Sequence, residues 1–116
     1  MLKKINRLKK KYNFDRLYRH GKLAKIQSIQ VRVSPNRTFL NRFATVVPQA
    51  VSKKSTVRNA LRRKIYNIFE RLLKSQKLKP GLDIMVSLKL EPQENENIEE
   101  EIKTLLIKLG CLNISP

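Results

Sequence analysis

The sequence predicts a single small α+β domain, with helices packed on a small sheet. The sequence contains three short segments typical of β-strands, at residues 29–33, 43–47 and 82–88. They either alternate apolar with polar residues or are mostly apolar. Two longer segments, 56–74 and 98–109, repeat apolar residues every three or four positions, the period of an amphipathic helix. Helices and strands in this order favour a layer of helices against a sheet. A chain of 116 residues suits one hydrophobic core.

The N-terminal part is basic and holds a short helix. We expect residues 1–6 to form a solvated, partly disordered arm that RNA can order. Asn13 is a candidate N-cap, and Gly21 ends the helix. Three large side chains share one helix face: Phe14, Leu17 and Tyr18. Such a stripe is commonly core, but Phe14 and Tyr18 are also candidates for stacking on nucleobases.

The strands follow this helix. Segment 29–33 alternates as a half-buried strand does, with Gln30 and Arg32 pointing outward, whereas 43–47 is more apolar and should lie deeper in the sheet. Residues 34–37 predict a turn between them. Segment 82–88 has one strongly apolar face, which we expect to share the core with the apolar side of helix 56–74.

Helix 56–74 has two unlike sides. Its apolar side carries Val57, Leu61, Ile65, Ile68 and Leu72, and its polar side includes Asn59 and Arg63. Ser55 or Thr56 is the predicted N-cap, directly after Lys53 and Lys54. Cations there add to the positive electrostatic potential with which a helix N-terminus attracts anions. The last helix should be capped by Asn97 and end at Gly110, before a tail at 111–116.

The charge is unevenly distributed. The chain carries +17, and six of its nine acids lie between 91 and 101, so residues 1–90 hold 24 basic and 3 acidic groups. We expect a domain with this charge to bind a polyanion. Basic residues spread over several elements favour nucleic acid over an anionic membrane, and no apolar run approaches the roughly 18–20 residues that span a bilayer. No signal peptide is evident, and the single Cys111 fits a reducing compartment, so we expect a cytoplasmic protein.

Catalytic groups are scarce. The acids outside 91–101 are Asp15, Glu70 and Asp83, one on each of three separate elements. A metal-dependent nuclease gathers several carboxylates around its ions. We therefore expect no catalytic residues and no bound cofactor in the protein itself, and no small-molecule substrate.

Three motifs resemble those of the bacterial ribonuclease P protein component family. They are Arg58-Asn59-x-x-Arg62-Arg63 after a lysine-rich loop, the segment from Phe14 to Gly21, and the segment from Pro80 to Val86. Together they cover roughly residues 7–110 in the family's order. The sequence departs from the family pattern at Gln49, Ala50, Ala60 and Tyr66, where members commonly carry basic residues.

This resemblance implies a ribosomal-protein-like fold in the order α-β-β-β-α-β-α, with a left-handed βαβ crossover. An extra short strand at residues 22–26 completes that order. It also implies an accessory subunit of an endoribonuclease whose RNA subunit holds Mg²⁺ and cleaves the 5′ leader from precursor tRNA. The RNA subunit would contact Lys53, Lys54, Arg58, Asn59, Arg62 and Arg63. The leader would occupy a cleft around Phe14, Tyr18 and Arg32.

Two other interpretations stay open at this point. A small ribosomal protein or another structural RNA-binding protein would share the charge, but would not stimulate tRNA 5′ processing. A DNA-binding nucleoid module would prefer duplex DNA. The coincidence of an aromatic first helix with the Arg-Asn-x-x-Arg-Arg helix counts against both.

Overall fold

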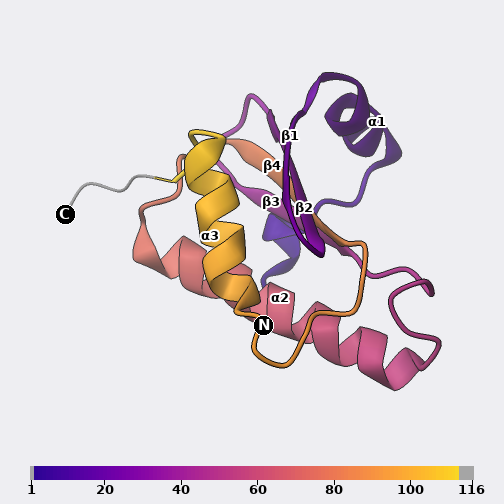
Figure 1. Cartoon of the computed structure of the whole chain (residues 1–116). Helices are drawn as coiled ribbons and strands as arrows, with labels where there is room; N and C mark the ends of the chain where they lie inside the picture. The colour runs from indigo at the N-terminus through magenta and orange to yellow at the C-terminus, as the bar shows by residue number, and fades with distance from the viewer. Residues whose placement is uncertain (1, 113–116) are drawn as a thin grey trace.

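The structure, a computed structural model, describes residues 2–112. Its elements (Figure 1) are η1 Lys4–Asn6, α1 Lys11–His20, β1 Lys22–Ile26, β2 Ile29–Pro35, β3 Arg42–Val46, α2 Ser55–Ser75, β4 Leu82–Leu88 and α3 Ile98–Lys108. The α+β class and the order α-β-β-β-α-β-α are confirmed, including the strand at 22–26.

The four strands form one mixed sheet in the order β1-β2-β4-β3. β2 pairs antiparallel with β1 on one side and with β4 on the other. In the β2–β4 pair, the register runs from Ile29 opposite Leu88 to Pro35 opposite Leu82. β3 and β4 are parallel neighbours, and α2 connects them. A left hand for this crossover stays a prediction from the resemblance.

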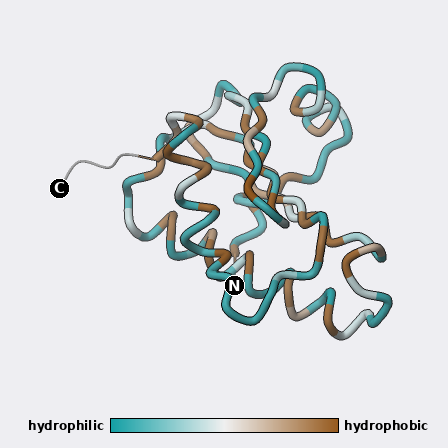
Figure 2. Tube along the Cα trace, in the orientation of Figure 1, coloured by the Kyte–Doolittle hydropathy of each residue, from teal (hydrophilic) through white to brown (hydrophobic). Residues whose placement is uncertain are grey.

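The main core lies between one sheet face and the two long helices. Alternate residues of β2 and β4 are buried there with Ile65, Ile68 and Leu72 of α2 and with the apolar stripe of α3. The predicted shared core is therefore confirmed. Phe69, which the predicted stripe left out, is also buried and stacks on Phe43 with ring centroids 4.4 Å apart. Figure 2 shows the matching alternation of hydrophobic and hydrophilic residues along the helices.

The opposite face of the sheet is covered in part by α1, which lies apart from α2 and α3 in Figure 1. Leu17 of α1 is fully buried against Met85 of β4, with Leu8 and Ala44. β4 is consequently buried on both faces, although its sequence alternates.

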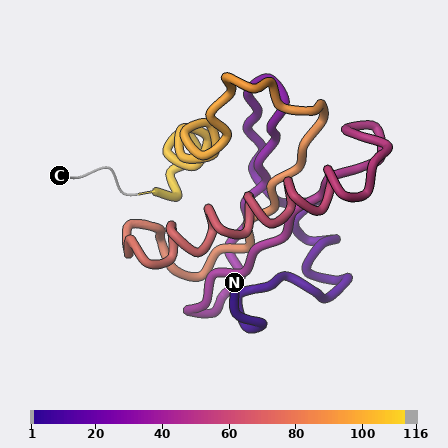
Figure 3. Tube along the Cα trace, turned by 90° about the horizontal axis from the view of Figure 1, so that it is seen from below, coloured from indigo at the N-terminus to yellow at the C-terminus, as the bar shows by residue number. Residues whose placement is uncertain are grey.

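The N-terminal segment is attached to the fold at both of its ends, whereas Lys3, Lys4 and Ile5 between them are exposed. The expected disorder of residues 1–6 stays a prediction. Leu2 is only 4% exposed and belongs to the main core. Asn6 Nδ2 donates to the Asn41 carbonyl (2.8 Å), and the Leu8 N–H donates to the Phe43 carbonyl (2.8 Å). The free edge of β3 thus supplies partners that composition could not reveal. Figure 3 shows this indigo segment close to the middle of α2, while residue 1 lies outside the described residues.

Two predicted helix caps are wrong and one is confirmed. Asn13 lies inside α1, where it is buried and accepts a hydrogen bond from Arg16 (2.8 Å). α2 begins at Ser55 after an extended Lys54, without a side-chain cap. Asn97 does cap α3, because its side chain accepts from the Glu100 N–H (3.2 Å).

Two predicted irregular segments are more ordered than expected. β2 continues through Ser34 and Pro35, because these residues pair with Asp83 and Leu82 of β4. In the predicted tail, Cys111 is buried and its carbonyl accepts from the Lys79 N–H (2.9 Å). Residues 113–116 lie outside the described residues.

Candidate nucleic-acid interface

The first half of α2 and the loop before it form a basic helix surface, which we define as Lys53, Lys54, Arg58, Asn59, Arg62 and Arg63. Arg58 donates to the Ser52 carbonyl (2.8 Å). Arg62 donates to the Asn59 side chain (2.6 Å) and to the Val47 carbonyl (3.3 Å). These bonds tie the loop to the helix, so the charges are held in place before any partner binds.

The basic helix surface is not neutralised by carboxylates. Among residues 2–112, none of the ion pairs involves Arg58, Arg62 or Arg63. Lys53 and Lys54 are exposed. Guanidinium and ammonium groups arranged in this way bind phosphate oxygens, the guanidinium with two donors at once.

Arg7 extends this surface in a way that the sequence did not indicate. Its guanidinium carbon lies 5.6 Å from the ring centroid of Tyr66. Leu2, Arg7, Arg63, Tyr66 and Asn67 line a small cavity of about 110 Å³. The N-terminal segment therefore supplies a cation beside Tyr66, the position where members of the resembled family commonly carry a basic residue.

A second candidate surface lies on the sheet face that α1 covers. Tyr18 is 53% exposed, and the Arg32 guanidinium carbon lies 4.9 Å from its ring centroid, a cation–π contact. The Tyr18 hydroxyl donates to the Met85 sulfur (3.7 Å). The ring is thus fixed at two points while much of it stays open to solvent.

These two residues line a groove of about 250 Å³, which we call the Tyr18 groove. Gln30, Met85 and Lys89 also line it, as do Pro48 and Ala50 of the loop before α2. The groove therefore reaches the loop that carries Lys53 and Lys54. Phe14 is set apart: it packs on the small core around Leu17 and does not line the groove.

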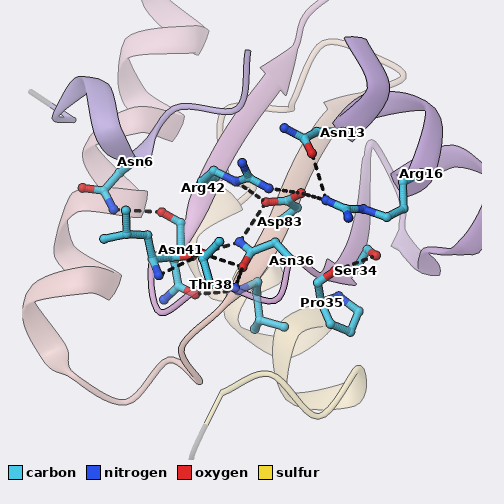
Figure 4. Close-up of polar contacts among 12 residues, drawn as sticks. Asn6, Asn13, Arg16, Ser34, Pro35, Asn36, Thr38, Asn41, Arg42 and Asp83 are labelled. Atoms are coloured by element: carbon cyan, nitrogen blue, oxygen red, sulfur yellow. Dashed lines mark hydrogen bonds and ion pairs between the residues drawn. The ribbon is translucent and has the colours of Figure 1, made fainter. Parts of the chain in front are cut away.

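A buried polar cluster, shown in Figure 4, joins α1 to the sheet. Asp83 of β4 is fully buried and accepts two hydrogen bonds from Arg42 (2.7 and 3.0 Å) and one from Asn36 (3.0 Å). Arg16 of α1 lies 3.6 Å from the same carboxylate. Sequence reasoning missed this cluster. The available signal was a lone acid within a strongly basic region.

The acidic segment has its own contact with the turn between β1 and β2. Ser28 donates to Glu96 (2.5 Å), and Glu96 shares a hydrogen bond with Glu101. Burial, this hydrogen bond and the charge of Glu96 raise the pKa of Glu101 from 4.5 to about 7. Burial also raises the pKa of Glu96, but the bonds from Ser28, Glu101 and Gln93 outweigh it and leave that pKa lowered.

The described residues contain no group of three or more His, Cys, Asp or Glu side chains that could hold a metal ion. Within residues 2–112, the helices are too short or too polar to cross a membrane.

Comparisons with known proteins point to one family. The ribonuclease P family profile matches residues 2–110. The chain is 32% identical over 114 residues to the ribonuclease P protein component of Rippkaea orientalis, covering 92% of this chain and 88% of that protein. It is 33% identical over 110 residues to that of Caldanaerobacter subterraneus, covering 93% and 92%.

Solved structures show the same fold. A Staphylococcus aureus RNase P protein superposes with a TM-score of 0.77 at 20% identity, covering 93% of this chain and 98% of that one. The Thermotoga maritima RNase P protein gives 0.66 at 23% identity, covering 89% and 93%. From its sequence relatives and its fold together, this chain belongs to the bacterial ribonuclease P protein component family, the protein subunit of an endoribonuclease that processes tRNA.

Proposed function

We propose that this chain binds the ribonuclease P RNA through the basic helix surface and holds the 5′ leader of precursor tRNA in the Tyr18 groove. Membership of the family implies association with the ribonuclease P RNA. The five basic residues of the basic helix surface, together with Arg7, supply the cations for the phosphates of this RNA.

The Tyr18 groove has the chemistry of a site for single-stranded RNA. Tyr18 offers a fixed aromatic face, and Arg32 and Lys89 offer positive charge on the same groove. Stacking of a base on an aromatic ring tolerates any base, because every base has a π-face. A leader of variable sequence fits such a site. Phe14 supports Tyr18 through the packing of α1 and is not proposed to touch the leader.

The hydrolytic step and its Mg²⁺ ions are assigned to the RNA subunit. The acids in residues 2–90 lie on three different elements, and the Asp83 oxygens are already bound by Arg42 and Asn36. The protein then contributes by positioning and by lowering electrostatic repulsion between the two RNAs. A cytoplasmic location accords with this role.

The observation that carries the proposal is the exposed Tyr18 ring, stacked against Arg32 in a groove that reaches the loop before the basic helix. The test combines the protein, a ribonuclease P RNA from the same organism and precursor tRNA at low Mg²⁺. We expect the protein to increase correct 5′ cleavage strongly, because cations on the protein replace part of the Mg²⁺ requirement. Cleavage by the protein alone, or no stimulation of the RNA, would contradict the proposal.

A further inference from the structure

The loop between β2 and β3, residues 36–41, presents a bare aromatic ring. Phe39 is 93% exposed, and we call this segment the Phe39 loop. Single exposed apolar residues are common on proteins. The Phe39 loop is unusual because its conformation is closely fixed by buried polar groups.

Asn36 organises the loop from below. Its Nδ2 donates to the Leu40 carbonyl (2.9 Å) and to the buried Asp83 (3.0 Å), and its Oδ1 accepts from the Thr38 N–H (2.9 Å). Leu40 N–H donates in turn to the Thr38 hydroxyl (3.1 Å). The chain is thus held on both sides of Phe39, and the ring is presented in a defined place.

The base of the loop is packed against the start of β4. Asn41 Oδ1 accepts from the Leu82 N–H (3.0 Å). Gly81 has a positive φ of 74°, and a Cβ there would come within 2.4 Å of the Thr38 carbonyl oxygen. Only glycine permits this close approach, which leaves the loop little freedom to fold Phe39 back onto the protein.

The surroundings of Phe39 are cationic. The hydrogen bond between Asn6 and the Asn41 carbonyl places η1 beside the loop, and Lys3 and Lys4 are exposed there. Arg37 is exposed within the loop itself. Two acids on elements that adjoin the loop or η1 are occupied: Asp83 is bound by Arg42, and Glu70 pairs with Lys74 (3.4 Å). An aromatic ring among cations matches a nucleobase flanked by phosphates.

The Phe39 loop continues the basic helix surface rather than the Tyr18 groove. Arg63 and Arg7 line one cavity on α2, and Lys3 and Asn6 line the next one along the helix, which leads to Asn41. The loop lies at the opposite end of β4 from the loop before α2, so about 20 Å of strand separates them. A partner that reaches both ends must be large, as a folded RNA is.

We propose that Phe39 stacks on an unpaired base of the ribonuclease P RNA, while Lys3, Lys4 and Arg37 neutralise the phosphates beside that base. This inference rests on the proposed function and adds a second contact to it. The loop is built before binding, so little ordering entropy opposes the contact.

The test uses substitutions at an exposed position, which leave the fold intact. The chain has no tryptophan, so Phe39→Trp introduces a single fluorescent ring that can still stack. Leu90→Trp is the matched control, because Leu90 is also exposed but adjoins the acidic segment 91–101. Phe39→Ala removes the ring. Each variant is titrated with the ribonuclease P RNA at one fixed salt concentration.

We expect Phe39→Ala to bind the RNA about five- to hundredfold more weakly. Phe39→Trp should bind like the wild type, with its fluorescence quenched by the stacked base, and Leu90→Trp should bind without quenching. Wild-type affinity in Phe39→Ala, or unchanged emission of Phe39→Trp in saturating RNA, would overturn the inference, including the case in which Phe39 serves a protein partner. Failure of the wild type to bind the RNA would instead refute the proposed function.

Discussion

Arg42 donates two hydrogen bonds, of 2.7 and 3.0 Å, to the buried carboxylate of Asp83. The pair joins the first residue of β3 to the second residue of β4. Asp83 also accepts a hydrogen bond from Asn36 of the Phe39 loop and lies 3.6 Å from the guanidinium of Arg16 of α1. One acid therefore holds together the parts that position both the Tyr18 ring and the Phe39 ring.

The first prediction concerns this acid. Asp83→Ala should lower the free energy of unfolding by about 3 kcal/mol or more, because Arg42 and Asn36 lose their buried acceptor. Urea unfolding followed by circular dichroism measures the change. Asp15→Ala removes an exposed acid from α1 and should stay within about 0.5 kcal/mol of the wild type. Equal stability of the two variants would show that the cluster contributes nothing.

A second prediction concerns the basic helix surface. The double variant Arg62→Ala, Arg63→Ala should bind the ribonuclease P RNA about tenfold more weakly or worse, because charged hydrogen bonds to phosphate are lost. The control, Arg71→Ala with Lys108→Ala, removes the same charge from α2 and α3 outside the surface. Filter binding compares them. If both double variants lose equal affinity, net charge and not this surface governs binding.

The third prediction is the salt dependence of the same complex. If six or more phosphates are neutralised, affinity should fall by about 10³ or more between 50 and 200 mM salt. The Arg62, Arg63 double variant should also show a shallower slope, by about 1 per arginine. A flat response of the wild type would contradict electrostatic binding.

Strong periodicity made α2 and β4 predictable. Helix 56–74 is observed as Ser55–Ser75 and strand 82–88 as Leu82–Leu88, because one face of each packs in the main core. β1 has only one buried residue, Ala24, so its own pattern is weak and the resemblance alone indicated it.

Features that depend on distant partners could not be predicted. Leu2 is buried because the N-terminal segment attaches to the edge of β3, and nothing within residues 1–6 specifies that edge. Asp83 looked like the solvated side of an alternating strand, and it is buried because α1 and the Phe39 loop close over it. Tyr18 and Phe14 share a helix face in sequence, yet only Tyr18 reaches the groove, since Phe14 packs beside Leu17.

A fourth prediction concerns pH and stability. Because the folded protein raises the pKa of Glu101 from 4.5 to about 7, it keeps a proton that the unfolded chain loses between these values. Stability should therefore fall as the pH rises from about 4.5 to 7. Glu101→Gln should flatten this part of the profile, and Glu94→Gln, an exposed acid of the same segment, should not. Thermal unfolding from pH 4.5 to 8 measures the stability profile of each variant. Parallel profiles for wild type and Glu101→Gln would show that the folded protein does not retain this proton on Glu101.

The last prediction separates Tyr18 from the general aromatic content of α1. Tyr12 is 62% exposed on the same helix, but Lys10 lies over its ring and it does not line the Tyr18 groove. Tyr18→Ala should weaken binding of precursor tRNA to the ribonucleoprotein about five- to hundredfold, the worth of one stacked base, and leave mature tRNA binding unchanged because mature tRNA has no leader. Tyr12→Ala should affect neither. Competition binding with both tRNA forms measures the effect, and equal loss for precursor and mature tRNA would place Tyr18 outside the leader site.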